Sequence, residues 1–381
     1  MNWLFTHTKG DRVIWIVVIL LSIFSILAVY SSTGTLAYKY AEGNTERYLL
    51  KHLFTFLLSF GLMYGAHRIR YTYYSRLSQI ALVIAIPMLL ITLVIGTNLN
   101  EASRWLTVPG TTITFQTSDF AKLALIMYVA RILSKKQDNI KDFRTAFLPV
   151  MIPVLAVCML ILPANFSTAA VLFTTCLFLM FIGRVNMKYI FIMLGTGLLL
   201  LSIFVSIALL SKNPGRVGTW KNRVENFMKE DGDGNYQSQQ AKIAIATGGL
   251  KGKGPGHSTQ RNFLPHPYSD FIYAIIVEEY GLAGGVLVVT LYIILFYRCV
   301  RIAYKSPRAF ATLLSVGCGF SLIFQAMINM AVAVNLFPVT GQPLPLVSMG
   351  GTSILFTGIA VGIILSISRE SETEDTHAAA E

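Results

Sequence analysis

Long apolar runs, separated by short polar connections, recur along nearly the whole chain. The runs lie at about 13–31, 49–66, 78–96, 119–134, 145–163, 165–182, 188–210, 270–297, 309–336 and 350–368. About 20 apolar residues in an α-helix cross the hydrocarbon core of a bilayer. Because a spanning segment must satisfy its own backbone hydrogen bonds, the pattern predicts an all-α integral membrane protein, a single bundle of about ten transmembrane helices.

Composition agrees with this class. Of the 381 residues, 54% are hydrophobic and 13% are charged. The first run follows Lys9 and Arg12 but lacks a small-residue cleavage pattern, so we expect a retained span and not a cleaved signal peptide. Cys158, Cys176, Cys299 and Cys318 lie in or beside apolar runs without metal-ligand spacing, which predicts buried thiols.

The formal net charge of +12 is distributed unevenly over the connections. Lysines and arginines collect in alternate short connections, which by the positive-inside rule places both termini in the cytoplasm. We therefore predict a membrane domain over residues 1–369, with one large external loop at about 211–269 and a disordered acidic cytoplasmic tail over 370–381.

The external loop is unexpectedly basic. It holds nine lysines and arginines, among them Arg216, Arg223, Lys242, Lys251, Lys253 and Arg261. They suit either an ordinary solvated surface or a pyrophosphate, which requires several cations. Apolar spacing predicts short helices over 220–229 and 236–247, followed by an irregular glycine-rich stretch.

Asp270 is the main candidate for chemistry, because it stands where this loop enters an apolar run. It suits either a functional carboxylate or a simple helix N-cap. Glu278 and Glu279 follow about 12–13 Å deeper along the predicted helix and require a cavity or a cationic partner. Lys122 is a candidate partner, although it also suits a local ion pair with Asp119.

The uncharged stretch 335–353 contains three prolines and three glycines before the last apolar run. Irregular backbone at membrane depth is tolerated where it is buried in protein or lines a cavity. We interpret this stretch as a cavity wall, with a purely structural corner as the alternative.

Several motifs, in order, resemble those of the SEDS family (shape, elongation, division and sporulation) over nearly the whole chain. Arg104-Trp105-Leu106 matches the family's R-W-L, and Gln116–Lys122 is similar to its Q-P-S-E-x-x-K. The loop signature is matched by Gln237, Gln240 and 248–260. The family's H-T-D-F-I-F-A, E-E-x-G and P-x-T-G-x-P-L-P patterns are matched by 268–274, 278–281 and 338–353. The spellings around Pro267 and Gln342 resemble the FtsW-type branch most.

The resemblance implies a bacterial cytoplasmic-membrane glycosyltransferase that polymerises lipid II on the extracytoplasmic face for septal cell-wall synthesis. It implies a class B penicillin-binding protein and other divisome proteins as partners, and no nucleic acid. Asp270 would be the general base, and Mg²⁺ or Mn²⁺ is a possible cofactor. No nucleotide or organic cofactor is expected, because a Walker A motif is missing. A lipid II transporter, a RodA-type elongation polymerase and a non-catalytic scaffold are the alternatives.

The predicted substrate-binding residues are basic residues or residues of the matched motifs that carry a polar group. They are Arg104, Trp105, Asp119, Lys122, Arg216, Arg223, Gln237, Lys242, Lys253, Ser258, Gln260, Glu279, Ser348 and Ser353.

Overall fold

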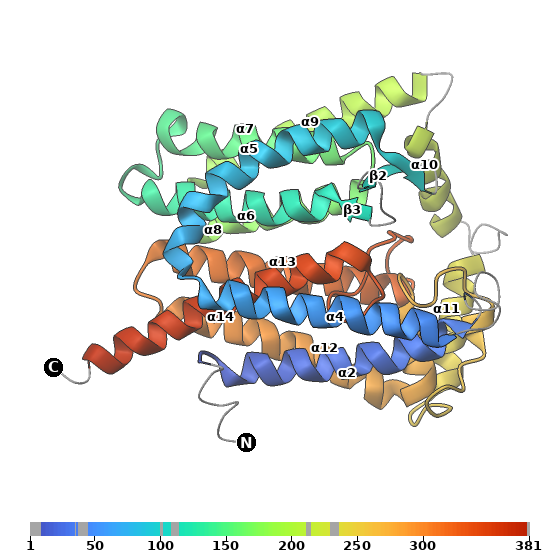
Figure 1. Ribbon diagram of the computed structural model, residues 1–381. Helices are drawn as coiled ribbons and strands as arrows, with labels where there is room; N and C mark the ends of the chain where they lie inside the picture. The colour runs from blue at the N-terminus through green and yellow to red at the C-terminus, as the bar shows by residue number, and fades with distance from the viewer. Residues whose placement is uncertain are drawn as a thin grey trace. The chain divides into compact units, whose positions relative to one another are not determined.

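Each of the ten apolar runs coincides with a helix in the computed structural model, which describes residues 9–34, 36, 45–99, 102–107, 114–210, 215–228 and 236–378. These helices are α2 (Arg12–Ser32), α4 (Thr45–Arg68), α5 (Tyr71–Ile95), α6 (Thr117–Lys135), α7 (Leu148–Ile161), α8 (Phe166–Ile182), α9 (Met187–Leu210), α12 (Ile272–Lys305), α13 (Ala309–Ala333) and α14 (Gly351–Ala378) (Figure 1). Eight helices of the described chain are long and apolar enough to cross a membrane, and α8 is a shorter apolar helix. The predicted all-α membrane class is confirmed, with eight candidate spans in the described residues where about ten were predicted.

Two further helices occupy the predicted external loop. α10 (Gly215–Met228) and α11 (Tyr236–Gly248) cover the segments for which apolar spacing predicted short helices. α10 exposes Val224 and Met228 as well as Lys221, in keeping with an amphipathic helix at an interface.

A small antiparallel sheet was not predicted. β1 (Thr97–Leu99), β2 (Ala102–Thr107) and β3 (Thr114–Gln116) form it in the order β1-β2-β3. Strands of three to six residues are too short to show a clear alternation of apolar and polar positions. The sheet pairs Trp105 with Gln116, so two motifs that are separate in the sequence become neighbours at the start of α6.

The chain divides into two compact units, of which the first comprises Met1–Tyr64, Asn222–Arg298 and Leu322–Ile359. Within it, Ser25 of α2 hydrogen-bonds to His52 of α4, with 2.9 Å between Oγ and Nε2. Asp11 caps α2 by accepting from Val13 N and also forms an ion pair with Arg298 of α12, at 2.5 Å. This pairing satisfies a buried carboxylate twice and fixes the beginning of α2 against α12.

The second unit comprises Gly65–Lys221, Cys299–Ser321 and Ala360–Glu381. Within it α6 packs against α5, α7 and α8. The buried Arg131 of α6 donates to Ser75 Oγ of α5 at 3.1 Å, and Phe178 stacks on Phe320 with 4.0 Å between ring centroids. The four cysteines of the chain are free and buried, as predicted.

The end of the chain differs from its prediction. α14 continues to Ala378. The residues from Glu370 to Ala378, which were expected to be a disordered tail, are therefore helical. Ser371 Oγ donates to Ile367 O at 3.0 Å and lies 3.2 Å from Ser306 Oγ, which anchors an additional turn beyond the apolar run. Polarity alone therefore did not mark the helix end.

Candidate active site

Asp270 lies in a turn that directly precedes α12. Ala274 N donates to Phe271 O at 3.0 Å, so the helical bonding begins one residue after Asp270. Its half-buried side chain accepts a hydrogen bond from Ser269 Oγ, at 2.8 Å from Oδ1. In the described residues no backbone N–H of α12 donates to this carboxylate, so the helix-cap alternative lacks the bond that defines a cap.

A non-helical segment packs against this turn. We call residues 338–348 the proline segment; Leu344, Leu346 and Val347 within it are buried. Side chains from four helices donate to five of its backbone carbonyls. The pairs are Arg223 Nη1 to Val339 O (2.9 Å), Asn329 Nδ2 to Gln342 O (2.7 Å), Gln325 Nε2 to Pro343 O (2.9 Å), Tyr292 OH to Pro345 O, and Ser25 Oγ to Val347 O (2.6 Å).

These bonds explain how irregular backbone can be buried here. Proline has no N–H and its ring disrupts helical hydrogen bonding, so a segment with several prolines leaves carbonyls that need other donors. A buried carbonyl without a donor costs about 1–3 kcal/mol. The donors from α2, α10, α12 and α13 provide the missing partners, so the predicted irregular stretch is buried and satisfied by hydrogen bonds.

The proline segment is joined directly to the Asp270 turn. Ser348 Oγ donates to Ser269 O at 2.6 Å and accepts from Leu344 N at 2.7 Å. Gly341 adopts a φ of 67°, and a Cβ at this position would lie 3.5 Å from Asp270 Oδ2. The backbone of the segment therefore forms one wall beside the carboxylate. Ser348, predicted to bind substrate, is buried and uses its hydroxyl twice within this wall.

Arg223 of α10 supplies a cation whose charge interacts with that of Asp270. The pKa of its guanidinium is lowered. Burial is the larger cause, and the negative charge of Asp270 partly offsets it. Because an arginine stays protonated in proteins, this side chain keeps a positive charge that interacts with the Asp270 carboxylate. The predicted role of Arg223 near an anionic ligand is therefore compatible with its position, while its Nη1 also holds Val339.

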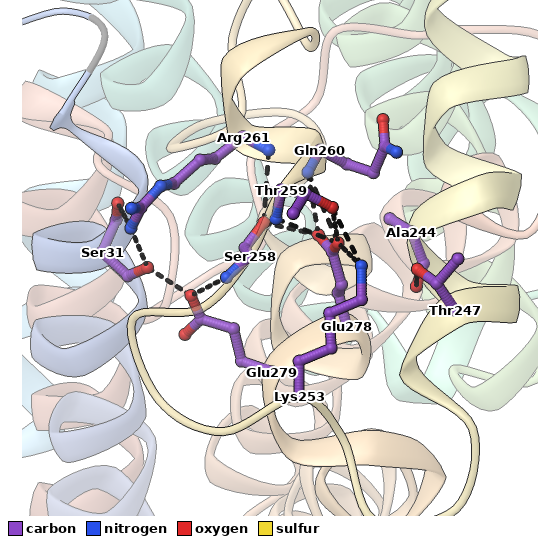
Figure 2. Close-up of polar contacts among 10 residues, drawn as sticks. All are labelled: Ser31, Ala244, Thr247, Lys253, Ser258, Thr259, Gln260, Arg261, Glu278 and Glu279. Atoms are coloured by element: carbon purple, nitrogen blue, oxygen red, sulfur yellow. Dashed lines mark hydrogen bonds and ion pairs between the residues drawn. The ribbon is translucent and has the colours of Figure 1, made fainter.

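Glu278 and Glu279 form the centre of a second polar cluster, shown in Figure 2. The Glu278 carboxylate is fully buried and accepts from Lys253 Nζ at 2.5 Å and Ser258 Oγ at 2.5 Å. It also accepts from Thr259 N at 3.1 Å and Gln260 N at 3.3 Å. The cationic partner suggested from the sequence, Lys122, was wrong for this carboxylate: Lys253 is its partner, and Lys122 lies 3.8 Å from Asp119 in a local ion pair.

Glu279 connects the same loop to the end of α2. Its Oε1 accepts from Ser31 Oγ and from Ser258 N, the latter at 3.3 Å. Arg261 Nη1 donates to Ser31 O at 2.9 Å, which places a cation at the C-terminus of α2, where the helix dipole favours one (Figure 2). Lys253 and Arg261 therefore hold the loop in place. Together with Arg223, which donates to Val339 O, three of the six candidate cations already have internal partners.

The glycines of the loop permit close contact between its backbone and α12. Lys253 N donates to Glu278 O and Gly254 N to Glu279 O, both at 2.9 Å. A Cβ on Gly252 would collide with the backbone of Glu279, and Gly281 interrupts the helical geometry with a φ of 70°. The backbone of the glycine-rich stretch therefore packs directly against the backbone of the E-E-x-G motif.

Gly252→Ala is expected to be far more disruptive than Gly249→Ala. Both glycines have left-handed φ angles, 79° and 54°, but a Cβ on Gly249 meets nothing within 4 Å. The backbone conformation alone costs about 1–2 kcal/mol for alanine at either position. Thermal unfolding of the detergent-solubilised protein measures the difference, and equal unfolding midpoints for the two variants would contradict the close packing at Gly252.

The other predicted site residues occupy varied positions. Asp119 is buried in the first turn of α6, Trp105 and Gln237 are half-buried, and Lys242 is exposed on α11. Ser353, at the start of α14, is half-buried. The side chains of Arg104 and Arg216 lie outside the described residues. That any of these residues binds substrate stays a prediction.

Four residues of this site were not singled out from the sequence. Ser25, Tyr292, Gln325 and Asn329 are polar groups within apolar runs, and each donates to the proline segment. Gln325 and Asn329 stand four apart on α13, on one face of a helix, which was the available signal.

The described residues contain no group of three or more His, Cys, Asp or Glu side chains able to hold a metal ion. Magnesium bound together with substrate phosphates requires as few as one or two protein carboxylates. The Oδ2 of Asp270 accepts no hydrogen bond from the described residues, so this one carboxylate fits such an ion.

The chain resembles known proteins over almost its full length. The family model FTSW_RODA_SPOVE, described as "Cell cycle protein", matches residues 11–373. Stage V sporulation protein E of Bacillus subtilis is 33% identical over 374 residues, which cover 96% of this chain and 98% of that protein. The probable peptidoglycan glycosyltransferase FtsW of Geobacter sulfurreducens is 33% identical over 369 residues, covering 94% of this chain and 95% of the relative.

Solved structures share the fold. A chain from a peptidoglycan synthase complex has a TM-score of 0.71 and 22% identity, covering 95% of this chain and 98% of its own length. The rod shape determining protein RodA of Thermus thermophilus has a TM-score of 0.68 and 21% identity. The match covers 97% of this chain and 99% of the RodA chain. With the family model and the curated relatives, these findings place this multi-pass membrane glycosyltransferase in the FtsW/RodA/SpoVE family of cell cycle proteins.

Proposed function

We propose that this protein is a peptidoglycan glycosyltransferase that polymerises lipid II, with Asp270 as general base. The observation that carries the proposal is the setting of Asp270. Its carboxylate lies beside the wall formed by the proline segment and interacts with the charge of the Arg223 guanidinium, and Oδ2 accepts no hydrogen bond from the described residues. A carboxylate that is held at one oxygen and open at the other suits proton abstraction.

The proposed reaction is a direct displacement at the anomeric carbon of the donor sugar. Asp270 takes the proton of the acceptor's 4-hydroxyl, and the hydroxyl oxygen forms the new bond to the anomeric carbon. The bond from that carbon to undecaprenyl pyrophosphate breaks, and the leaving group keeps the electron pair. One displacement inverts the anomeric centre without a covalent enzyme intermediate.

The leaving pyrophosphate requires positive charge beside it. Arg223 is the candidate whose charge interacts with that of Asp270, whereas Lys253 and Arg261 hold the loop. Lys242 and Lys251 are exposed and accessible to an anion. Arg104, Lys122 and Arg216 stay candidates from the sequence for contact with an anionic ligand. A Mg²⁺ or Mn²⁺ ion held by Asp270 and the phosphate oxygens would add charge neutralisation at the same place.

The cellular setting follows from the relatives. Several are named as FtsW, which supports a role in septal wall synthesis, and one structural neighbour belongs to a peptidoglycan synthase complex, which supports a penicillin-binding protein as partner. The positive-inside pattern supports cytoplasmic termini and a site on the outer face of the cytoplasmic membrane. RodA-type elongation is the alternative role within the same chemistry.

Polymerisation of purified lipid II is the direct test. We expect the purified protein, together with a penicillin-binding partner that lacks its own transferase, to convert lipid II into glycan chains resolved by gel electrophoresis. Absence of polymer with and without this partner would contradict the proposal. Translocation of lipid II across liposome membranes, measured with the same preparation, would then support the transporter alternative.

A further inference from the structure

Asn329 of α13 joins the Asp270 turn to the proline segment through a single side-chain amide. Its Nδ2 donates to Asp270 O at 2.8 Å and to Gln342 O at 2.7 Å. The side chain is 1% exposed, so water does not compete for these bonds. Both hydrogens of one NH₂ group therefore hold the backbone on the two sides of the candidate site.

The Asp270 backbone requires such a partner because α12 does not hold it. Ala274 N and Ile275 N both donate to Phe271 O, the first acceptor of the helix. Asp270 precedes this point, and its carbonyl accepts from Asn329 instead. The direction of the Asp270 side chain thus depends on a residue 59 positions away in the sequence.

The amide of Asn329 has one workable orientation. Turning it over would place its oxygen against two carbonyl oxygens, which offer no donor. In the observed orientation Oδ1 is buried without a hydrogen-bond partner among the described residues. An unpaired buried acceptor is destabilising, and the two bonds made by Nδ2 offset that cost.

We propose that Asn329 is a positioning residue for Asp270: it fixes the separation between the Asp270 backbone and the Gly341–Gln342 wall. This inference rests on the proposed role of Asp270 as base. A base must stay within hydrogen-bond reach of the hydroxyl that it deprotonates, and a displacement of about 1 Å can lower a rate about 100-fold.

Gln325 provides a matched control on the same helix. It lies one turn before Asn329 and donates its amide to Pro343 O at 2.9 Å, so it supports the same segment. Asn329 differs from it in donating to Asp270 O as well as to the proline segment. Asn329→Leu and Gln325→Leu remove an amide of the same kind, but Asn329→Leu also removes the bond to Asp270 O.

The experiment measures kcat and KM for lipid II in both variants, with their unfolding midpoints. We expect Asn329→Leu to lower kcat about 100-fold with little change in KM, and Gln325→Leu to lower it about fivefold at most. If Asn329→Leu does not fold, Asn329→Ala replaces it, because alanine also removes both bonds and adds no bulk at this position. Equal losses in the two variants, or a raised KM with unchanged kcat, would overturn the inference.

A double-mutant cycle separates positioning from general destabilisation. In the Asp270→Asn background, Asn329→Leu should cause little further loss of the residual rate, because the group that it positions is already gone. A full additional loss would show an effect independent of Asp270 and would overturn the inference. An inactive parent protein would instead contradict the proposed function itself.

Discussion

Asp270→Asn is expected to lower the rate of polymer formation from lipid II by about 10²–10⁴-fold, the range that general-base catalysis typically contributes. Asparagine keeps the size of the side chain and can still accept the hydrogen bond from Ser269 Oγ. It cannot take a proton from a hydroxyl at neutral pH. The unfolding midpoint should therefore remain near that of the parent protein while activity is lost.

This substitution also separates the base from a helix cap. Asparagine and aspartate cap helices about equally well, so a residue that served only as a cap would tolerate the change. Ser269→Ala is the matched control, because it removes the hydrogen bond to Oδ1 and leaves the carboxylate. One such bond contributes about 1 kcal/mol, so we expect about a fivefold loss at most. Equal polymer formation by Asp270→Asn and the parent would refute the base assignment.

Glu278→Leu is expected to release the loop that precedes Asp270. Leucine leaves the backbone N–H groups of Thr259 and Gln260 without this acceptor, and an unpaired buried donor costs about 1–3 kcal/mol. The side chain itself is fully buried, so solvent cannot replace it. We expect a lower unfolding midpoint and rapid proteolysis between residues 249 and 262.

Lys253→Met and Asp138→Asn are the controls for this prediction. Lys253 is only one of several donors to Glu278, and its side chain is 27% exposed, so its loss should cost less than the loss of the carboxylate. Asp138 is an exposed carboxylate, and its neutralisation should leave the loop intact. A loop that resists protease equally in Glu278→Leu and Asp138→Asn would contradict the anchoring role.

The sequence predicted the membrane helices well because their signal is local. Twenty consecutive apolar residues identify a spanning helix without reference to the rest of the chain. The same holds for α10 and α11, whose apolar spacing indicated short helices in the loop. The three short strands gave no comparable signal, and the acidic residues after Arg369 resembled a tail although they continue α14.

The site was only partly predictable because its contacts are not local. Asp270 was identified from its position at the mouth of an apolar run, but the partner of Glu278 required the folded loop, where Lys253 lies 25 residues away. Lys122 was the wrong choice for this role, because a lysine in another motif of the sequence need not lie near the carboxylate in the folded protein. Asn329, Gln325 and Tyr292 carried no sign of their common target, which is a set of backbone carbonyls.

The five carbonyl bonds of the proline segment have a consequence for biosynthesis. Ser25 lies near the N-terminus and Val347 near the end of the chain, 322 residues apart, and the other donors lie between them. Synthesis proceeds from the N-terminus, so α2 is present long before its partner exists. The wall beside Asp270 cannot form until almost the whole chain has been translated and its helices assembled. A nascent or truncated chain that stops before Val347 therefore contains the carboxylate without the surroundings that orient it.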